Sequence, residues 1–523
     1  MPPSLTKKVG LAALIMMASV LLSRVIGLLR NMVIGYLGGA SGAVDAYQVA
    51  FIIPEILNHV VASGFLSVTF IPIFSGYLVQ NKEAEGWQVF SLILTTFGAM
   101  LIVLIGIAFI FAPQLVAITA PGLKDASQIA SAIRMTRIIL PAQLFFFIGG
   151  MLMAVQFAKE QFKLPALAPL IYNLGIILGG ILLSRWIGME GFSWGVLAGA
   201  FVGNFWIQYV GAKRAGMKLS PIFDLRHPDL KKYVLLTLPL MVGLTATFSN
   251  EFFYRFFGSY LPQGGVATLD YALRVMFVLV GIFGQAAGVA SFPFLARLVA
   301  EGKLAEMNRL LNDTLRRYIA LVIPFSVLLM VLRHEVIRLL FQRGSFDAVA
   351  TARTSAALMF TLIGAFAFAG QTVVVRGYYA MQDTLFPTIF GTLAVLASLP
   401  LYWYGMQHLG INGVALAMSI SAIIQTTLLY ALWNHRAGNA GSAAIYQFFA
   451  KMIVLSAVTG LALHWFKTQA LYSIDLATFN GSLLSCLIIG SIFALAFVTS
   501  GYIFHIAEIE NMTNRLVKKL FGK

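Results

Sequence analysis

Residues 18–39 read ASVLLSRVIGLLRNMVIGYLGG, and residues 41–65 read SGAVDAYQVAFIIPEILNHVVASGF. Both stretches are apolar runs that contain a few strongly polar residues. An α-helix that begins near Leu11 reaches Arg24 after about 20 Å of rise, which is well inside a bilayer core of about 30 Å. The first stretch therefore predicts a membrane-spanning helix with a deeply placed arginine.

The second stretch carries Gln48, Glu55, Asn58 and His59 at spacings of seven, three and four residues, which is one face of a helix. A charge near the membrane centre costs roughly 2.5 to 3.5 kcal/mol, so such a face should meet water or another polar group. For Arg24 alone, a snorkelling side chain or a helix–helix hydrogen bond is an equally good interpretation. Several polar faces in one chain favour a hydrophilic cavity inside a helical bundle.

The composition indicates a polytopic membrane protein. The 523 residues are 59% hydrophobic and 11% charged, and the mean hydropathy is +0.86. These values are far too apolar for a soluble domain. The single Cys486 offers neither a disulfide nor a thiolate metal site. The net charge of +16 lies mostly in short connectors and tails, which favours anionic lipid headgroups and topology signals over a nucleic-acid partner.

Apolar segments continue along the chain and predict an all-α protein of about fourteen transmembrane helices. After the opening pair they lie near 88–117, 132–157, 165–187, 191–212, 232–260, 267–296, 316–341, 353–380, 387–406, 411–434, 446–467 and 480–504. A cytoplasmic N-terminus places most basic connectors and the C-terminal tail on the same side. Four arginines go against this trend: Arg333, Arg338, Arg343 and Arg353. The summed bias still predicts that both termini are cytoplasmic.

The two halves of the chain contain similar sequence motifs at a similar spacing. FAKEQFKLP at 157–165 matches YAMQDTLFP at 379–387, and Asp45 with Pro72 matches Asp270 with Pro293. All these separations are about 220 to 225 residues. The sequence therefore predicts two pseudo-repeated six-helix lobes in a transporter-like arrangement, followed by two more helices. We expect an N-lobe over 1–220, a C-lobe over 221–440, and two further helices with an interfacial tail over 441–523.

Arginines inside these spans are the candidate substrate ligands. A guanidinium offers paired donors and keeps its charge when desolvated, which suits a diphosphate. Glu251 and Arg255 are four residues apart and are expected to neutralise each other. Asp270 is expected to compensate its neighbour only in part. The predicted diphosphate site consists of Arg24, Arg30 and Arg274, and the predicted polar cavity or gating residues are Asp45, Glu55, Asn58, His59 and Gln285.

No pattern in the chain indicates catalysis. It has no glycine-rich loop followed by lysine, no zinc-spaced histidine pair, and no nucleophile with an evident base. His59 is better interpreted as a cavity liner or a pH-responsive group than as a metal ligand. We therefore expect a transporter and not an enzyme, with no cofactor and no ATP site. The membrane potential or a cation gradient would then drive its cycle.

The residues also resemble a known family. SRVIGLLRN at 23–31, DAYQVAFIIPEIL at 45–57 and FIPIF at 70–74 resemble the opening of the MurJ (MviN) lipid II flippases. The resemblance covers nearly the whole chain, and its further motifs are TAPG at 119–122, QFKLPALAPLIYN at 161–173, LFQRGSFD at 340–347, GYYAMQDTLFP at 377–387 and GINGVALAMSIS at 410–421.

This resemblance implies a bacterial inner-membrane protein of the multidrug/oligosaccharidyl-lipid/polysaccharide (MOP) exporter superfamily. It implies fourteen helices, with two six-helix lobes in a V around a cationic cavity and a lipid-tail groove made by the last two helices. The implied activity moves an undecaprenyl-diphosphate-linked peptidoglycan precursor to the outer leaflet by alternating access. Membrane lipids and cell-wall synthesis enzymes are the further partners that it suggests.

Position by position, Arg24, Arg30, Asp45 and Arg274 match family residues that are important for activity. The chain departs from the family pattern at Asn31, Asn58, His59, Ser63, Phe277 and Leu279. These departures make the expected cavity less cationic. An alternative function is therefore that of a divergent paralogue that moves another polyprenyl-diphosphate-linked saccharide.

Two further alternatives follow from the same residues. A cation-coupled drug exporter of the superfamily would rely on acidic cavity residues such as Glu55, and dye efflux dependent on Glu55 would support it. A non-transporting scaffold that recruits cell-wall enzymes would tolerate mutations in the cavity. The polar faces inside apolar spans speak against a scaffold, because buried charges are costly there.

Overall fold

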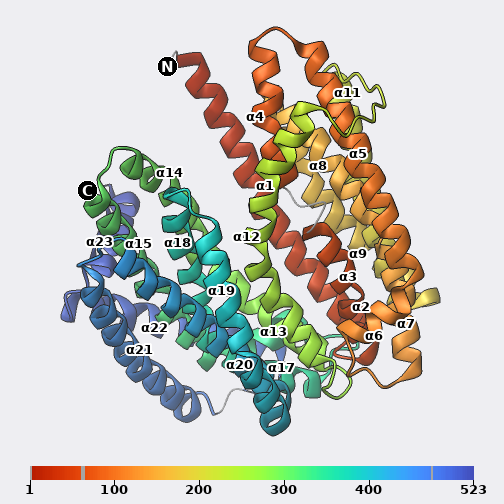
Figure 1. The fold of residues 1–523 in the computed structure, drawn as a ribbon. Helices are drawn as coiled ribbons and strands as arrows, with labels where there is room; N and C mark the ends of the chain where they lie inside the picture. Colours follow the sequence, from red (N-terminus) through yellow and green to blue (C-terminus); the bar gives the residue numbers. More distant parts are fainter. Residues whose placement is uncertain (1–2, 60–64, 473–474, 523) are drawn as a thin grey trace. The chain divides into compact units, whose positions relative to one another are not determined.

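The computed structural model describes residues 3–59, 65–472 and 475–522, and omits the side chains of 3–13, 65–68, 238–250, 284–290, 516, 520 and 521. Every regular element in the described ranges is a helix, which confirms the all-α prediction (Figure 1). The chain divides into two compact units: unit 1 is Met1–Ala267 with Arg343–Phe346, and unit 2 is Thr268–Gln342 with Asp347–Lys523. The lobe boundaries expected from the sequence repeat stay a prediction.

Unit 1 is built from the first twelve α-helices and the start of α13. Their bounds are α1 (Pro3–Gly38), α2 (Gly42–Ala50), α3 (Ile52–Leu57), α4 (Phe65–Val79), α5 (Glu83–Ile110), α6 (Ala112–Thr119), α7 (Ala126–Ile139), α8 (Ala142–Ala158), the short η2 (Pro165–Leu167), α9 (Ala168–Ile187), α10 (Glu190–Gly199), the π-helix η3 (Ala200–Trp206), α11 (Ile207–Arg214) and α12 (Pro228–Gly258).

Unit 2 contains most of α13 and all later helices. Their bounds are α13 (Gly265–Val280), the π-helix η4 (Gly281–Gln285), α14 (Ala286–Ala300), α15 (Leu304–Val331), α16 (Arg333–Phe341), α17 (Ala348–Ile363), α18 (Ala365–Ala380), α19 (Leu385–Ala397), α20 (Leu399–Arg436), α21 (Ser442–Ala470), α22 (Phe479–Ile503) and α23 (Ala507–Phe521).

Within the described ranges, nine helical stretches are long and apolar enough to cross a membrane, or ten if the bent pair α17 and α18 is one span. The polytopic class is confirmed, whereas the number fourteen stays a prediction. Breaks within the helices explain part of the difference between these two numbers. The span expected at 41–65 is divided between α2 and α3. Leu385–Arg436 is counted as one stretch, although Gly410, with φ of 57°, breaks the helix inside α20 at a kink.

The pseudo-repeat is visible in the backbone of each unit. Left-handed residues recur in pairs whose numbers differ by 221 to 225, as the two halves of the sequence do. One pair, Glu160 and Gln382, is not glycine, and a positive φ is uncommon for such residues. The other pairs are Gly39 and Gly264, Asn81 and Gly302, Gly188 and Gly410, and Gly216 and Gly438. Residues of positive φ that recur at nearly the same offset support two pseudo-repeated lobes.

Matching helix N-caps add to this repeat. The Asp125 carboxylate accepts hydrogen bonds from the amides of Ser127 and Gln128 at the start of α7, and Asp347 accepts one from the Ala350 amide at the start of α17. Aspartate is a preferred N-cap because it satisfies amides that have no partner within the helix. The Ser127 hydroxyl and these amides hold the pKa of Asp125 below its ordinary value.

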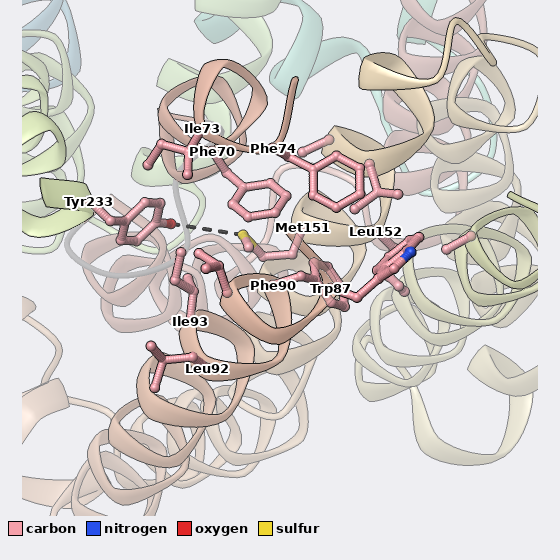
Figure 2. Close-up of a cluster of buried hydrophobic side chains, with 14 of the residues drawn as sticks. Phe70, Ile73, Phe74, Trp87, Phe90, Leu92, Ile93, Met151, Leu152 and Tyr233 are labelled. Atoms are coloured by element: carbon pink, nitrogen blue, oxygen red, sulfur yellow. Dashed lines mark hydrogen bonds between the residues drawn. The ribbon is translucent and has the colours of Figure 1, made fainter. Parts of the chain in front are cut away.

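An aromatic cluster forms one core of unit 1. Phe70 and Phe74 on α4 pack against Trp87 and Phe90 on α5, with ring centroids 5.0 to 5.8 Å apart. Figure 2 shows this cluster between α4, α5, α8 and α12, with the Tyr233 hydroxyl donating to the Met151 sulfur at 3.8 Å. The cluster ties α12 to the earlier helices of unit 1.

Glycines allow α9 and α10 to pack closely. A Cβ on Gly175 would lie 2.5 Å from the Gly199 Cα, and one on Gly179 would lie 2.5 Å from the Gly195 Cα. Small residues at four-residue spacing are the usual means of close helix packing in membranes, where backbones approach without side chains between them. The contact of α9 with α10 therefore depends on the absence of side chains at these positions.

Gly175→Ala should lower the melting temperature of the purified protein. The added methyl group would meet backbone atoms, and overpacking of this kind costs about 1 to 3 kcal/mol. Gly150→Ala on α8 is the matched control, because a Cβ there meets nothing within 4 Å. The control should be neutral or stabilising, since alanine is the better helix former. Equal melting temperatures for the two variants would contradict the packing argument.

Candidate substrate-binding site

Arg30 lies on α1, where its guanidinium is held by neutral partners. It donates to the Asn173 side-chain oxygen on α9 at 3.1 Å and to the Asn31 side-chain oxygen at 3.3 and 3.4 Å. Asn173 in turn donates to the Ser23 hydroxyl and the Pro169 carbonyl. Arg30 forms no ion pair among the described residues, so its positive charge is oriented but not neutralised.

Arg24 lies six residues before Arg30 on the same helix. Its side chain is exposed, as are its neighbours Leu21, Leu22 and Val25. Six residues correspond to about 9 Å along a helix. The structure therefore places Arg24 within a membrane-candidate stretch, Leu14–Gly38, as an exposed residue.

Glu55 on α3 and Arg255 on α12 form a two-point ion pair. One guanidinium nitrogen contacts Glu55 closely and the other donates at 3.3 Å. Glu251, the partner expected from the i, i+4 spacing, is 4.0 Å away and contributes less. Arg255 is only 1% exposed, and its Nε donates to the Tyr254 hydroxyl at 3.0 Å. Sequence reasoning did not predict this ion pair, because Glu55 and Arg255 are 200 positions apart in the chain.

The other polar residues of the second span have separate surroundings. His59 Nδ1 lies 2.7 Å from the Glu55 carbonyl oxygen, one helical turn earlier. Asn58 is half-buried at the end of α3, and Gln48 is buried on α2. Ser63 and the side chain of Gln285 lie outside the described residues. His59 therefore contacts the backbone of Glu55, and a shared polar cavity of Gln48, Glu55, Asn58 and His59 stays a prediction.

Asp45 on α2 is buried and binds backbone amides. Its two carboxylate oxygens accept hydrogen bonds from the Gly264 amide at 2.6 Å and the Ala267 amide at 2.7 Å, at the start of α13. The residue is 3% exposed. A carboxylate at a helix N-terminus satisfies unpaired amides and complements the helix dipole. Asp45 thus fixes the beginning of α13 to α2 within unit 1.

Asp45→Ala should destabilise the protein by about 1 to 3 kcal/mol, because two buried amides lose their acceptor. Asp45→Asn should be milder, since it keeps one side-chain oxygen. Asp224→Ala is the control, because that carboxylate is exposed in a connector and accepts one amide of Arg226. Chemical or thermal unfolding in detergent measures the difference. A loss for Asp45→Ala no larger than for Asp224→Ala would show that the contact is dispensable.

Unit 2 contributes Arg274 and Asp270 on α13. Arg274 Nη2 lies 3.0 Å from the Asp270 carboxylate, and their side chains are 33% and 3% exposed. The expected partial compensation is therefore a direct ion pair within one helical turn. Arg274 belongs to a different unit from Arg24 and Arg30, and their joint role as a diphosphate site stays a prediction.

The guanidinium groups of Arg24, Arg30 and Arg274 can bind an anion. Guanidiniums with exposed or neutral surroundings suit a phosphate, because they offer several donors at fixed geometry. Among the described residues, no three histidine, cysteine or acidic side chains gather where they could hold a metal ion. The arrangement favours binding and release of a charged ligand by a membrane-embedded protein.

The fold defines a multi-pass helical membrane protein. The structure superposes on a solved structure of lipid II flippase MurJ in an inward closed conformation, with a TM-score of 0.74 and 22% identity over 93% of this chain and 99% of that one. It also superposes on an inward-facing multidrug resistance MATE family transporter, with a TM-score of 0.67 and 14% identity over 81% and 96%.

Sequence comparisons assign the chain to one family within this class. The family model described as "Lipid II flippase MurJ" matches residues 34–480, so the chain belongs to this family. Curated relatives include the lipid II flippase MurJ of Burkholderia cenocepacia, 26% identical over 85% of this chain and 87% of the relative. A probable lipid II flippase MurJ of Rickettsia prowazekii is 24% identical over 94% and 97%. Membership confirms the resemblance found in the sequence and a multi-pass inner-membrane location.

Proposed function

We propose that this protein moves lipid II from the inner to the outer leaflet of the bacterial inner membrane by alternating access. The observation that carries the proposal is the family match over residues 34–480, which includes most of the helices that bear the polar groups. The substrate is the lipid-linked peptidoglycan precursor, and the protein catalyses no bond chemistry. Cell-wall synthesis enzymes are candidate partners.

The proposal gives the arginines the role of diphosphate ligands. Arg30 supports it, because its oriented guanidinium has only amide partners and no ion pair in the described part of the chain. Arg24 is exposed, so a ligand can reach it. Arg274, in unit 2, is one-third exposed and is the third ligand in this proposal. A diphosphate can accept hydrogen bonds from two or three such groups.

A cation-coupled drug exporter is less well supported. That function needs a carboxylate able to exchange a proton or a cation, and Glu55 was the candidate. Both of its oxygens contact the buried Arg255 guanidinium. A carboxylate held in this way is a poor site for a second cation, since binding would compete with a desolvated ion pair.

We further propose that the cycle runs without a cofactor, that the membrane potential or a cation gradient resets it, and that both termini are cytoplasmic. The basic connectors between the spans support this orientation. A charge that crosses the membrane gains about 2.3 kcal/mol per 100 mV, which is enough to bias a conformational change.

Reconstitution in liposomes tests the function. Labelled lipid II is placed in one leaflet, and an impermeant reagent measures how much becomes accessible in the other. We expect transfer of lipid II but not of labelled phosphatidylcholine, and growth of cells depleted of their own flippase. Transfer of another undecaprenyl-diphosphate-linked saccharide without lipid II would identify a divergent paralogue. Failure with both substrates, despite a folded protein, would refute the proposal.

A further inference from the structure

Small and polar residues line the face of α1 that packs against α9. Ser19, Ser23 and Gly27 follow one another at four-residue spacing, which places them on one side of the helix. The Ser19 hydroxyl donates to the Ala166 carbonyl, just before α9. A Cβ on Gly27 would lie 3.9 Å from the side-chain oxygen of Asn173, so the glycine leaves this space to the amide. Asn173 of α9 is thus packed directly against α1.

The side-chain amide of Asn173 has a fixed orientation. Its nitrogen donates to the Pro169 carbonyl at 2.9 Å and to the Ser23 hydroxyl at 3.3 Å. A carbonyl can only accept hydrogen bonds, so the amide nitrogen must face Pro169 and the amide oxygen must face away from it. That oxygen accepts a hydrogen bond from Arg30 Nη1 at 3.1 Å. Asn173 therefore presents an acceptor, and not a donor, to the guanidinium.

Arg30 keeps donors that the described part of the protein does not use. A guanidinium has five N–H groups. Nη1 donates to Asn173, and Nε and Nη2 donate to Asn31. One N–H on each terminal nitrogen therefore has no partner among the described residues, and the side chain is only half-buried. These two donors suit a ligand that carries several acceptor oxygens.

The partners of Arg30 also leave its charge uncompensated, because both are neutral amides. One acidic residue lies in the same neighbourhood: Tyr172, next to Asn173, interacts electrostatically with both Arg30 and Glu55. Glu55 is held by Arg255 through both carboxylate oxygens, so those two charges cancel each other. An amide orients a guanidinium without neutralising it, whereas a carboxylate at position 173 would form an ion pair with it.

We propose that Asn173 is a positioning residue that makes the Arg30 site prefer a diphosphate to a monophosphate. Its neutral oxygen holds the guanidinium in place, so the full positive charge and the two remaining donors are left for the ligand. A diphosphate carries more negative charge and more acceptor oxygens than a monophosphate, and it gains more from an uncompensated cation. This inference rests on the proposed function, because it takes Arg30 to be a ligand of the substrate's diphosphate.

Binding of farnesyl diphosphate and farnesyl monophosphate to the full-length protein in detergent tests this role. The wild type should bind the diphosphate more tightly. Asn173→Asp has nearly the same shape but adds a negative charge beside Arg30, so it should weaken diphosphate binding about tenfold or more and reduce the preference for the diphosphate.

Asn173→Ala separates the charge from the lost hydrogen bonds. The Pro169 carbonyl and the Ser23 hydroxyl lose the same donor in Asn173→Ala as in Asn173→Asp, so this loss cancels when the two variants are compared. Asn173→Ala leaves the charge of Arg30 intact, and it should weaken binding by a smaller factor and keep the preference for the diphosphate. Equal preferences in the two variants would overturn the proposal.

Asn312→Asp in unit 2 is the matched control. Asn312 is 7% exposed, exchanges hydrogen bonds with Asn439 and accepts one from Tyr430, and none of these partners is an arginine. The same substitution there should lower the melting temperature and leave the preference for the diphosphate unchanged. Equal losses of preference in Asn312→Asp and Asn173→Asp, or equal weakening of both ligands by Asn173→Asp, would show that Asn173 has only a structural role.

Transfer of lipid II in liposomes distinguishes this inference from the proposed function. Asn173→Asp should transfer lipid II more slowly than Asn173→Ala. Transfer by Asn173→Asp at the wild-type rate would refute the role of Asn173 and leave the proposed function standing. A wild-type protein that transfers no lipid II would refute the proposed function, and the binding of the two farnesyl phosphates would then still decide whether Asn173 sets the preference of Arg30.

Discussion

Replacing Glu55 with Gln should cost this protein about 3 to 5 kcal/mol of stability. Arg255 is 1% exposed, and Glu55 is its main acidic partner. With a neutral amide at position 55, the buried guanidinium would retain only Glu251, which is 4.0 Å away. Because folded proteins are stable by about 5 to 15 kcal/mol, such a loss should lower the yield and the melting temperature markedly.

The double variant Glu55→Leu with Arg255→Met distinguishes structure from function. Removing both charges leaves no unpaired buried ion, so folding should recover to near the wild-type level. Glu85→Gln is the matched control, because Glu85 is 53% exposed and lies 3.6 Å from Lys82, and such exposed pairs contribute about 0 to 1 kcal/mol. A Glu55→Gln variant as stable as Glu85→Gln would show that Arg255 does not depend on Glu55.

Transport by the double variant is the second measurement. Ionisable groups inside apolar spans are expensive and are generally retained for function. We expect the double variant to be folded and inactive in lipid II transfer. A folded and active double variant would make the pair a replaceable structural contact.

The fold class could be predicted from the sequence because hydropathy and the internal repeat are strong signals. The repeat predicted from the segments at 157–165 and 379–387 recurs in the left-handed residues Glu160 and Gln382. The number of fourteen spans stays a prediction. Helix breaks such as the one between α2 and α3, and the kink at Gly410, do not change the hydropathy of a segment.

The sequence indicates which residues belong to the candidate site, but it does not indicate which residues they contact. The i, i+4 rule pairs Arg255 with Glu251, but Glu55, from a distant helix, makes the closer contact. Only the fold brings such residues together. Asp45 was expected to be a polar cavity or gating residue, and its partners are the backbone amides of Gly264 and Ala267. Backbone donors have no sequence signature, so this contact could not be read from residue identities.

Arg24→Ala and Arg30→Ala should each abolish lipid II transfer while leaving protein levels normal. Each hydrogen bond between a guanidinium and a phosphate contributes about 1.5 to 3 kcal/mol, so losing two should slow transfer roughly a hundredfold or more. Folding should be preserved, because Arg24 is exposed and the partners of Arg30 are neutral amides. Growth of depleted cells and transfer in liposomes measure the outcome.

Substitution by lysine separates charge from geometry at these positions. Lysine keeps the positive charge but loses the planar fork, so Arg30→Lys should transfer more than Arg30→Ala and less than the wild type. Arg274→Ala should be made together with Asp270→Asn, because Asp270 is 3% exposed and would otherwise lose its ion-pair partner. Arg134→Ala is the control, since Arg134 is exposed and pairs with Glu190 on α10. Normal growth of depleted cells that express Arg24→Ala, or Arg274→Ala with Asp270→Asn, would show that these arginines do not bind the substrate. Loss of hydrogen-bond donors to the diphosphate should weaken its binding.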